Sequence, residues 1–246
     1  GIVGYVGPQE AADILLEGLK RLEYRGYDSA GIAVLKDATI ALRREVGKIR
    51  NLEREVLANP APGTLGIGHT RWATHGRPTT YNAHPHTDCS GKLVVVHNGI
   101  IENYLELKNE LIEAGHTFDS DTDTEVIAHL VESYYEGNLL IAMQKAYGRL
   151  HGTYACVVMH QDEPERIVGV KAGNPLVAGI GQGEQFLASD VAAILSYTRD
   201  ILYLEDGEIV EVTRDAITVF EPNLRPKNKE VHRIDWNLVA AEKAGY

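Results

Sequence analysis

The sequence is poor in cysteine and has no long apolar run, and each absence excludes a class of protein. Its 246 residues include two cysteines, Cys89 and Cys156, with no CxxC pair and no spacing typical of metal ligands, so no metal centre is expected. No apolar stretch is long enough to span a membrane. Because no charged-then-apolar leader precedes the first apolar segment, a cytoplasmic location is expected.

Basic residues are also scarce. The 24 Lys and Arg residues are outnumbered by 35 Asp and Glu residues, which gives a formal net charge of −11. Nucleic acid is therefore not expected as a partner, since binding its phosphates requires clustered Lys and Arg. An apolar content of 44% is ordinary for a globular protein, and the chain is long enough to bury a substantial core.

The two cysteines occur in contexts that favour structural roles. Cys156 lies in the apolar, strand-like run 153–159, which is typical of a core position. Cys89 lies in the turn-like stretch 87–91. Neither context supplies an evident base, so a nucleophilic role is the weaker interpretation for both.

The order of predicted elements favours an α+β domain of layered sheets and helices. A strand over 2–6 is followed by an amphipathic helix over 11–22 and a strand over 31–35. Further strands are predicted near 65–69, 93–96, 153–160, 166–171, 176–180, 185–188, 201–204, 208–213 and 216–220, and helices near 104–112, 122–134 and 139–150. In the second of these helices, Thr122 and Glu125 match a capping box.

The end of the sequence differs in composition from the rest. Residues 221–233 are polar, contain two prolines and read as a linker. An amphipathic segment starts at Trp236 and stops at Tyr246. We predict a domain over 1–220 and, over 221–246, a linker with the start of a further segment. A docked C-terminal helix is the alternative.

Three short motifs each have two interpretations. Asn98-Gly99 follows an apolar strand and offers a side-chain NH2 and a backbone N–H, which suit an oxyanion hole, but the dipeptide is also common in tight turns. His84-Pro85-His86 has no third ligand at metal spacing, so a structural role is expected. The glycine-rich stretch 179–184 is expected to be a hairpin turn, because it departs from the nucleotide-binding pattern.

Several stretches together resemble one family. Gly1-Ile2-Val3-Gly4, Tyr24 to Ser29, His69 to Gly76, Asn82 to His86, Val96 to Tyr104 and Ser120 to Leu130 are similar to those of the N-terminal-nucleophile glutamine amidotransferases, above all the branch that aminates fructose 6-phosphate. The resemblance implies a four-layer αββα N-terminal-nucleophile hydrolase fold. It also implies hydrolysis of L-glutamine to L-glutamate and ammonia through a cysteinyl thioester, without a cofactor. The ammonia would pass to a sugar-phosphate isomerase domain beyond Tyr246, in a homodimeric full-length enzyme.

The resemblance also assigns roles to individual residues. Arg71 would hold the α-carboxylate of glutamine and Asp123 its α-ammonium, although a surface arginine and a helix-opening carboxylate are the plain alternatives. Gly76 is a candidate hinge for a loop that closes over glutamine. The implied catalytic residues are Gly1, Arg25, Asn98 and Gly99, and the implied substrate-binding residues are Arg71, Trp72, Thr74, His75, Gly76, His97 and Asp123. For Arg25, the alternative is a helix end capped by Gly26.

In this family the nucleophile is a cysteine directly before the Gly-Ile-Val-Gly strand, and its own α-amine serves as the base. Gly1 is in register with the residue after that cysteine, so we expect the intact protein to carry a cysteine immediately before Gly1. Two alternatives stay open. One is a catalytically inactive glutamine-binding or sensing domain, and the other is the glutaminase domain of a different amidotransferase, such as amidophosphoribosyltransferase.

Overall fold

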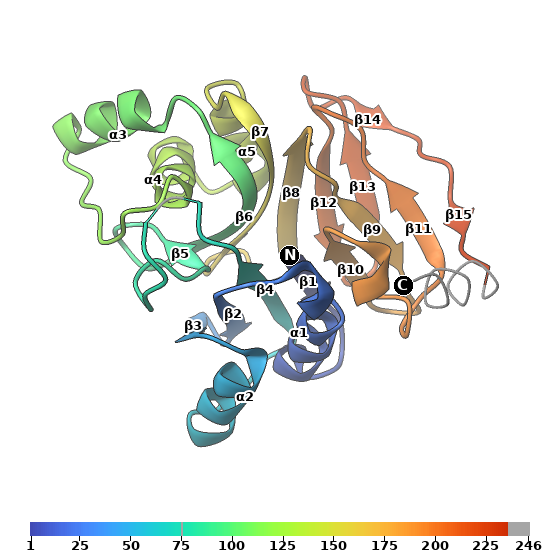
Figure 1. Cartoon of the computed structure of the whole chain (residues 1–246). Helices are drawn as coiled ribbons and strands as arrows, with labels where there is room; N and C mark the ends of the chain where they lie inside the picture. The colour runs from blue at the N-terminus through green and yellow to red at the C-terminus, as the bar shows by residue number, and fades with distance from the viewer. Residues whose placement is uncertain (75, 236–246) are drawn as a thin grey trace.

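The computed structural model of the protein describes residues 1–74 and 76–235, which form two stacked antiparallel sheets with helices on both outer faces (Figure 1). The first sheet has the order β15 (His232–Arg233), β11 (Asp200–Tyr203), β9 (Val177–Ile180), β10 (Gln185–Ala188), β1 (Ile2–Val6), β4 (Leu65–Arg71), β2 (Ser29–Lys36), β3 (Thr39–Val46). The second has the order β14 (Pro226–Lys227), β13 (Ile217–Phe220), β12 (Ile209–Thr213), β8 (Arg166–Ala172), β7 (Gly152–His160), β6 (Leu93–Ile101), β5 (His86–Thr87).

The helices divide between the two sheets. The first sheet is covered by α1 (Ala11–Lys20) and α2 (Ile49–Ala58), and the second by α3 (Tyr104–Glu113), α4 (Thr124–Tyr134) and α5 (Leu139–Tyr147). Two short 3-10 turns, η1 (Glu23–Arg25) and η2 (Val191–Ala193), complete the described elements. The predicted four-layer αββα fold is confirmed.

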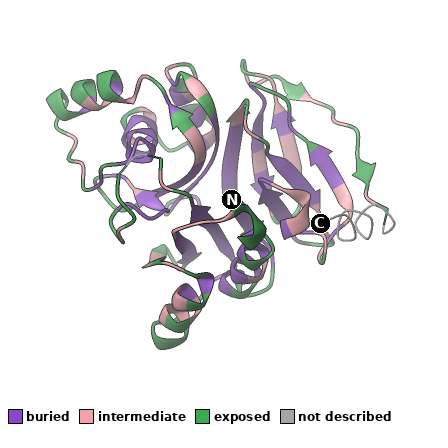
Figure 2. Cartoon of the chain, viewed as in Figure 1, coloured by how far each residue is buried: buried purple, intermediate pink, exposed green. Residues whose placement is uncertain are grey.

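Alternating side chains of the central strands fill the cores between the layers. In β1, Val3 and Tyr5 pack against the helices, whereas Ile2 and Val6 pack between the sheets. The strands β6 and β7 divide their side chains in the same way. Because both faces of the central strands are covered, they read in the sequence as continuous apolar runs, and Figure 2 shows most of their length buried.

Most predicted strands and helices occur close to their expected positions, and the hairpin predicted at 179–184 joins β9 to β10. The strand β3 and the helix α2 were not predicted. Most side chains of β3 are only partly buried, and only Ile49 and Leu52 of α2 are buried. Elements with so few buried positions give a weak apolar pattern.

Two local predictions are wrong. The strand β6 does not end before Asn98-Gly99 but continues to Ile101, so the dipeptide is not a tight turn. The capping box does not form, because α4 begins at Thr124 with Asp123 as its N-cap and no side-chain capping bond. The carboxylate of Glu125 instead accepts hydrogen bonds from the preceding loop, including the N–H of Ser120 at 2.7 Å.

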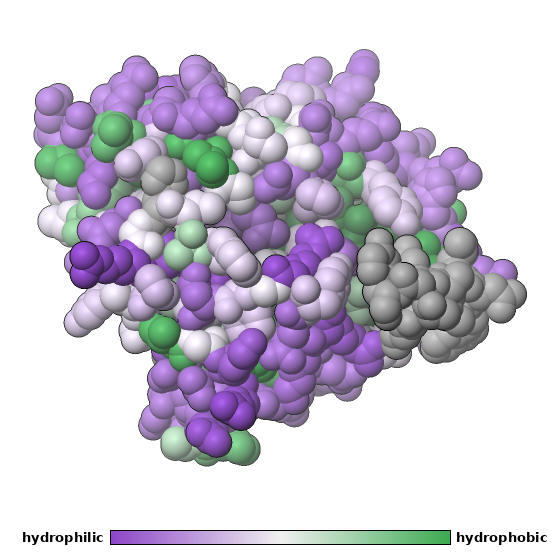
Figure 3. All heavy atoms as spheres, in the orientation of Figure 1, coloured by the Kyte–Doolittle hydropathy of each residue, from purple (hydrophilic) through white to green (hydrophobic). Residues whose placement is uncertain are grey.

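The polar segment that follows residue 220 is attached to both sheets. The strand β14 pairs with β13, and β15 pairs with β11. The amphipathic segment predicted from Trp236 lies outside the described residues, and the boundary after residue 220 stays a prediction. No helix in the described part of the chain is long and apolar enough to cross a membrane, and hydrophobic residues are scattered over the face in Figure 3.

Candidate active site

A cavity of about 410 Å³ lies at the start of β1, where the N-terminus sits near the centre of Figure 1. Its lining includes nine of the predicted residues: Gly1, Arg25, Arg71, Trp72, Thr74, His97, Asn98, Gly99 and Asp123. These residues come from the start of β1, from η1, β4 and β6, and from the loops that follow β4 and precede α4. Stacking of the two sheets therefore brings together residues that are far apart in the sequence.

Gly1 is held at the floor of the cavity by main-chain pairing. Its nitrogen donates to the carbonyl of Thr70 at 2.7 Å, and the N–H of Thr70 donates back to the Gly1 carbonyl at 3.0 Å. The next residue is fixed as well, since the N–H of Ile2 donates to Ser189 Oγ at 2.9 Å. Burial, and then the nearby Arg25 cation, lower the pKa of the Gly1 ammonium to about 5. The site thus favours an uncharged nitrogen at this position.

Arg25 lies beside Gly1 at the edge of the cavity. Its Nη2 pairs with Asp190 Oδ2 at 2.6 Å, and its Nε donates to the Tyr24 hydroxyl at 2.9 Å. Gly26 does cap the η1 turn, with a φ of 72° and an N–H that donates to the Glu23 carbonyl. The cap and the electrostatic effect of Arg25 on Gly1 therefore coexist.

Asn98 is oriented by a buried histidine. Its Oδ1 lies 2.9 Å from His69 Nε2, which donates to it. The pKa of His69 is far below its ordinary value, chiefly because of burial and then because of the Gly1 ammonium, so the ring is neutral. With its oxygen held by His69, Asn98 directs its NH2 group, a double donor, elsewhere along the cavity wall.

Gly99 adopts a backbone conformation that other residues rarely adopt. Its φ is 106°, and a Cβ at this position would lie 2.0 Å from the carbonyl oxygen of Thr153 and 2.5 Å from Asn174 Nδ2. Only glycine fits here without strain. The close approach brings the main chain of β6, rather than a side chain, to the cavity.

Arg71 and Asp123 contribute opposite charges to the same cavity. Both are almost fully buried, at 4% and 3% exposure. Arg71 donates to the carbonyl of Gly76 at 3.2 Å, and Asp123 Oδ2 accepts from the N–H of Ile101 at 2.8 Å. Burial lowers the pKa of Arg71, while Asp28 and Asp123 oppose that shift. The plain alternative of a surface arginine is therefore wrong.

The predicted loop after β4 is only partly a cavity wall. Trp72 and Thr74 line the cavity and are exposed, and a Cβ on Gly26 would lie 2.4 Å from the Trp72 ring. Gly76 is not among the lining residues, although its carbonyl accepts from Arg71 and its φ is 77°. His75 lies outside the described residues.

Three buried histidines, His69, His84 and His97, form part of the cavity wall. His97 Nδ1 lies 2.8 Å from Thr124 Oγ1, and His84 Nε2 lies 3.1 Å from the same hydroxyl. His84 also stacks on His69, with ring centroids 4.0 Å apart. The structural role predicted for His84 agrees with these contacts, and it links β4, β6 and the start of α4.

Sequence reasoning missed several residues around the cavity. His69, Thr124 and Asn174 line it, and Ser189 anchors the start of β1. His69 and Thr124 lie in stretches that resemble the family, but neither residue was assigned a role. Asn174 and Ser189 come from parts of the chain where no motif was recognised.

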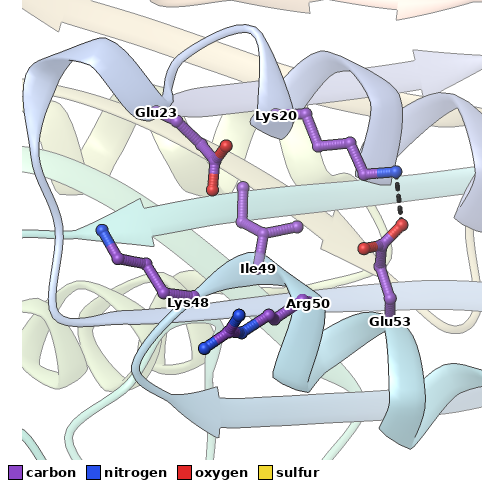
Figure 4. A pocket seen from close by; sticks show the side chains of 6 residues that line it. All are labelled: Lys20, Glu23, Lys48, Ile49, Arg50 and Glu53. Carbon is purple, nitrogen blue, oxygen red and sulfur yellow. Dashed lines mark ion pairs between the residues drawn. The ribbon is translucent and has the colours of Figure 1, made fainter.

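A second hollow, of about 470 Å³, lies between α1 and α2 and contains none of the predicted residues (Figure 4). It is lined by Ile49 and by charged side chains of both signs, two of which, Lys20 and Glu53, form an ion pair. The motifs therefore converge on the cavity at the start of β1 and not on this hollow.

The fold is shared with solved amidotransferase structures. The glutamine phosphoribosylpyrophosphate amidotransferase of B. subtilis, solved with ADP and GMP, is similar with a TM-score of 0.79 and 25% identity, over 92% of this chain and 50% of that chain. A glutamine aminotransferase class-II domain protein from Silicibacter pomeroyi shows the same fold, with a TM-score of 0.61 and 16% identity, over 89% of this chain and 98% of that chain. Fold and cavity together define a class II, N-terminal-nucleophile amidotransferase domain.

The family model described as a glutamine amidotransferase domain matches residues 69–196. The chain belongs to this family. It is 53% identical over its whole length to the glutamine–fructose-6-phosphate aminotransferases (isomerizing) of Clostridium perfringens and Thermus thermophilus. It spans 40% and 41% of the length of these two relatives.

Proposed function

We propose that this chain binds L-glutamine in the cavity at the start of β1 and hydrolyses its side-chain amide to L-glutamate and ammonia. One observation carries the proposal: a single cavity offers a buried cation, a buried carboxylate and a pair of N–H donors. Arg71 would bind the α-carboxylate, Asp123 the α-ammonium, and Asn98 with Gly99 the developing oxyanion. The remaining lining residues, Trp72, Thr74 and His97, would enclose the ligand, with His75 and Gly76 in the adjoining loop.

The chemistry follows from the position of Gly1. The proposed nucleophile is the thiol of a cysteine directly before Gly1, which would attack the amide carbon of glutamine. The tetrahedral oxyanion would accept hydrogen bonds from Asn98 and Gly99, and its collapse would release ammonia and leave a thioester. Water would then hydrolyse the thioester to L-glutamate.

The relatives are longer than this chain, which supports a role as one part of a larger enzyme. The proposal assigns the ammonia to a further, sugar-phosphate isomerase domain that converts fructose 6-phosphate to glucosamine 6-phosphate, because that acceptor appears in the relatives' name. The domain boundary after residue 220, a homodimeric full-length enzyme and a cytoplasmic location belong to the same proposal. Light scattering of the full-length protein tests the dimer.

Steady-state glutaminase kinetics test the proposal in the protein with a cysteine before Gly1. Asn98→Ala should lower kcat about 10²- to 10³-fold, because one oxyanion donor is lost. Arg71→Ala should instead weaken glutamine binding on the order of 100-fold, because charge-assisted hydrogen bonds are lost. Arg50→Ala, in the second hollow, is the control and should leave both parameters unchanged.

The competing function gives a different result. A glutamine-binding or sensing domain would bind glutamine through Arg71 and release no glutamate even with the cysteine in place. Unchanged glutamine affinity in Arg71→Ala would remove the carboxylate assignment. An unchanged kcat in Asn98→Ala would remove the oxyanion assignment.

A further inference from the structure

Four side chains with metal-binding atoms converge away from the active-site cavity. They are Cys89 in the turn after β5, His116 in the loop after α3, and His129 and Glu132 on α4. One ligand atom from each lies within 4.8 Å of the other three. His129 and Glu132 are three residues apart on one helix and so share a face. None of the four lines the active-site cavity.

Three of four distances between these atoms match a tetrahedral site, and the Glu132–His116 distance of 3.0 Å is shorter. Cys89 Sγ lies 3.6 Å from His116 Nδ1 and 3.4 Å from His129 Nδ1. Glu132 Oε2 lies 3.0 Å from His116 Nδ1 and 3.3 Å from His129 Nδ1. Tetrahedral zinc with bonds of about 2.3 Å to sulfur and about 2.0–2.1 Å to nitrogen requires neighbouring ligands to be roughly 3.3–3.6 Å apart.

The surroundings of the cluster are also those of a ligand shell. The N–H of Thr117 points at Cys89 Sγ from 3.4 Å, which would stabilise a thiolate. The far nitrogen of His129 lies 3.2 Å from Glu125 Oε1, so a carboxylate orients this imidazole from behind. Glu125 is itself held by the N–H groups of Asp119 and Ser120.

We infer that Cys89, His116, His129 and Glu132 bind a structural zinc ion. One thiolate, two imidazoles and one carboxylate form a donor set that suits zinc, and four protein ligands close the tetrahedron. Binding would displace the thiol proton of Cys89 and leave both Nδ1 atoms unprotonated, so it releases protons and weakens at acid pH. The sequence predicted no metal site, because three distant segments supply the four ligands.

The zinc would connect the active-site wall to the rest of the second sheet. It would tie the β5 turn, the loop after α3 and the helix α4 together at one point. Asp123 and Thr124, which line the active-site cavity, stand at the start of α4. The role is therefore to fix the position of α4, and no step of glutamine hydrolysis passes through the metal.

A metal-free explanation of the same cluster exists and makes different predictions. Glu132 Oε2 is approached by both imidazoles and by the N–H of Cys89 at 3.3 Å, so protonated histidines would satisfy it through hydrogen bonds alone. In that case the thiol of Cys89 is not required, and added zinc does not change the stability of the protein.

Metal analysis of the purified protein separates the two explanations. After saturation with zinc and removal of free metal, we expect about one zinc ion per chain. Replacement with cobalt should give the intense d–d bands of a tetrahedral ion and a thiolate-to-cobalt charge-transfer band. Cys89→Ser should abolish the charge-transfer band and lower zinc affinity at least about 100-fold. His151→Asn, at an exposed histidine outside the cluster, is the control and should bind like the unaltered protein.

Stability provides a second readout that does not depend on glutaminase activity. Zinc should raise the Tm of the unaltered protein and of His151→Asn, and a chelator should reverse the increase. Glu132→Gln should keep its fold by circular dichroism and show a smaller zinc-dependent increase. Absence of retained metal, or identical cobalt spectra in the unaltered protein and Cys89→Ser, would overturn the inference.

Discussion

At the scale of single residues, Gly99 is the position where backbone geometry and proposed chemistry depend on each other most closely. An alanine there would add a Cβ within 2.0 Å of the Thr153 carbonyl, in addition to the strain of a positive φ. We expect Gly99→Ala to lower the free energy of unfolding by about 3 kcal/mol or more, and to abolish glutaminase activity. Urea denaturation and ammonia release measure the two effects.

Gly183→Ala is the matched control for this prediction. Gly183 also has a positive φ, 68°, but nothing lies within 4 Å of an added Cβ. Backbone strain should therefore lower the free energy of unfolding of this variant by only about 1 kcal/mol, and the variant should keep its activity. An equal loss of stability in the two variants would mean that the close approach of β6 to Thr153 adds nothing to the cost of Gly99→Ala.

Residues with a distinctive chemical pattern could be predicted from the sequence, and their supporting neighbours could not. Asn98 and Arg71 were recognised because each lies in a stretch that resembles the amidotransferase family. Asn174 went unrecognised, because a single asparagine in a loop carries no pattern of its own. Its relation to Gly99 exists only once the second sheet has formed.

At the scale of elements, β4, β6 and α4 meet at the buried histidine cluster, and this contact should make stability depend on pH. Burial, above all, lowers the pKa of His69 and His84 far below 6.5 and that of His86 to about 3. These rings stay neutral in the folded protein while the unfolded chain takes up protons. Stability should therefore fall as the pH is lowered from 6.5 to 5, by about 1.4 kcal/mol per pH unit for each histidine.

The slope of stability against pH in His84→Asn tests this expectation. The free energy of unfolding is measured in urea at several pH values. In His84→Asn its slope against pH should be smaller by the equivalent of about one proton. The exposed His151 serves as the control, and His151→Asn should retain the slope of the unaltered protein. An unchanged slope in His84→Asn would show that folding does not keep the His84 ring neutral.

Elements with many buried positions were predicted well, and their ends were not. The continuous apolar run 93–96 predicts a strand, but its continuation to Ile101 depends on pairing with β7. Likewise, Glu125 matches a capping box locally, yet its carboxylate accepts from Asp119 and Ser120 and packs near His129. Tertiary contacts decided both cases.

At the scale of the whole molecule, the two stacked sheets explain how residues from distant motifs come to share one cavity. Apolar alternation indicates an α+β fold, but the order of the strands in each sheet is not encoded in any single segment. The central strand β1 pairs with β10 and β4, which are far from it and from each other in the sequence. The four-layer arrangement came from family resemblance, and stacking of the layers then places Gly1 beside Asn98 in the cavity lining.

The cavity at the start of β1 is proposed to bind glutamine in one orientation. A crystal structure of the protein with L-glutamate bound tests it most directly. We predict the α-carboxylate on Arg71, the α-ammonium on Asp123 and the side-chain carboxylate at Asn98 and Gly99, near the start of β1. A glutamate bound in the opposite direction, or in a different part of the molecule, would rule out the assigned roles of Arg71 and Asp123.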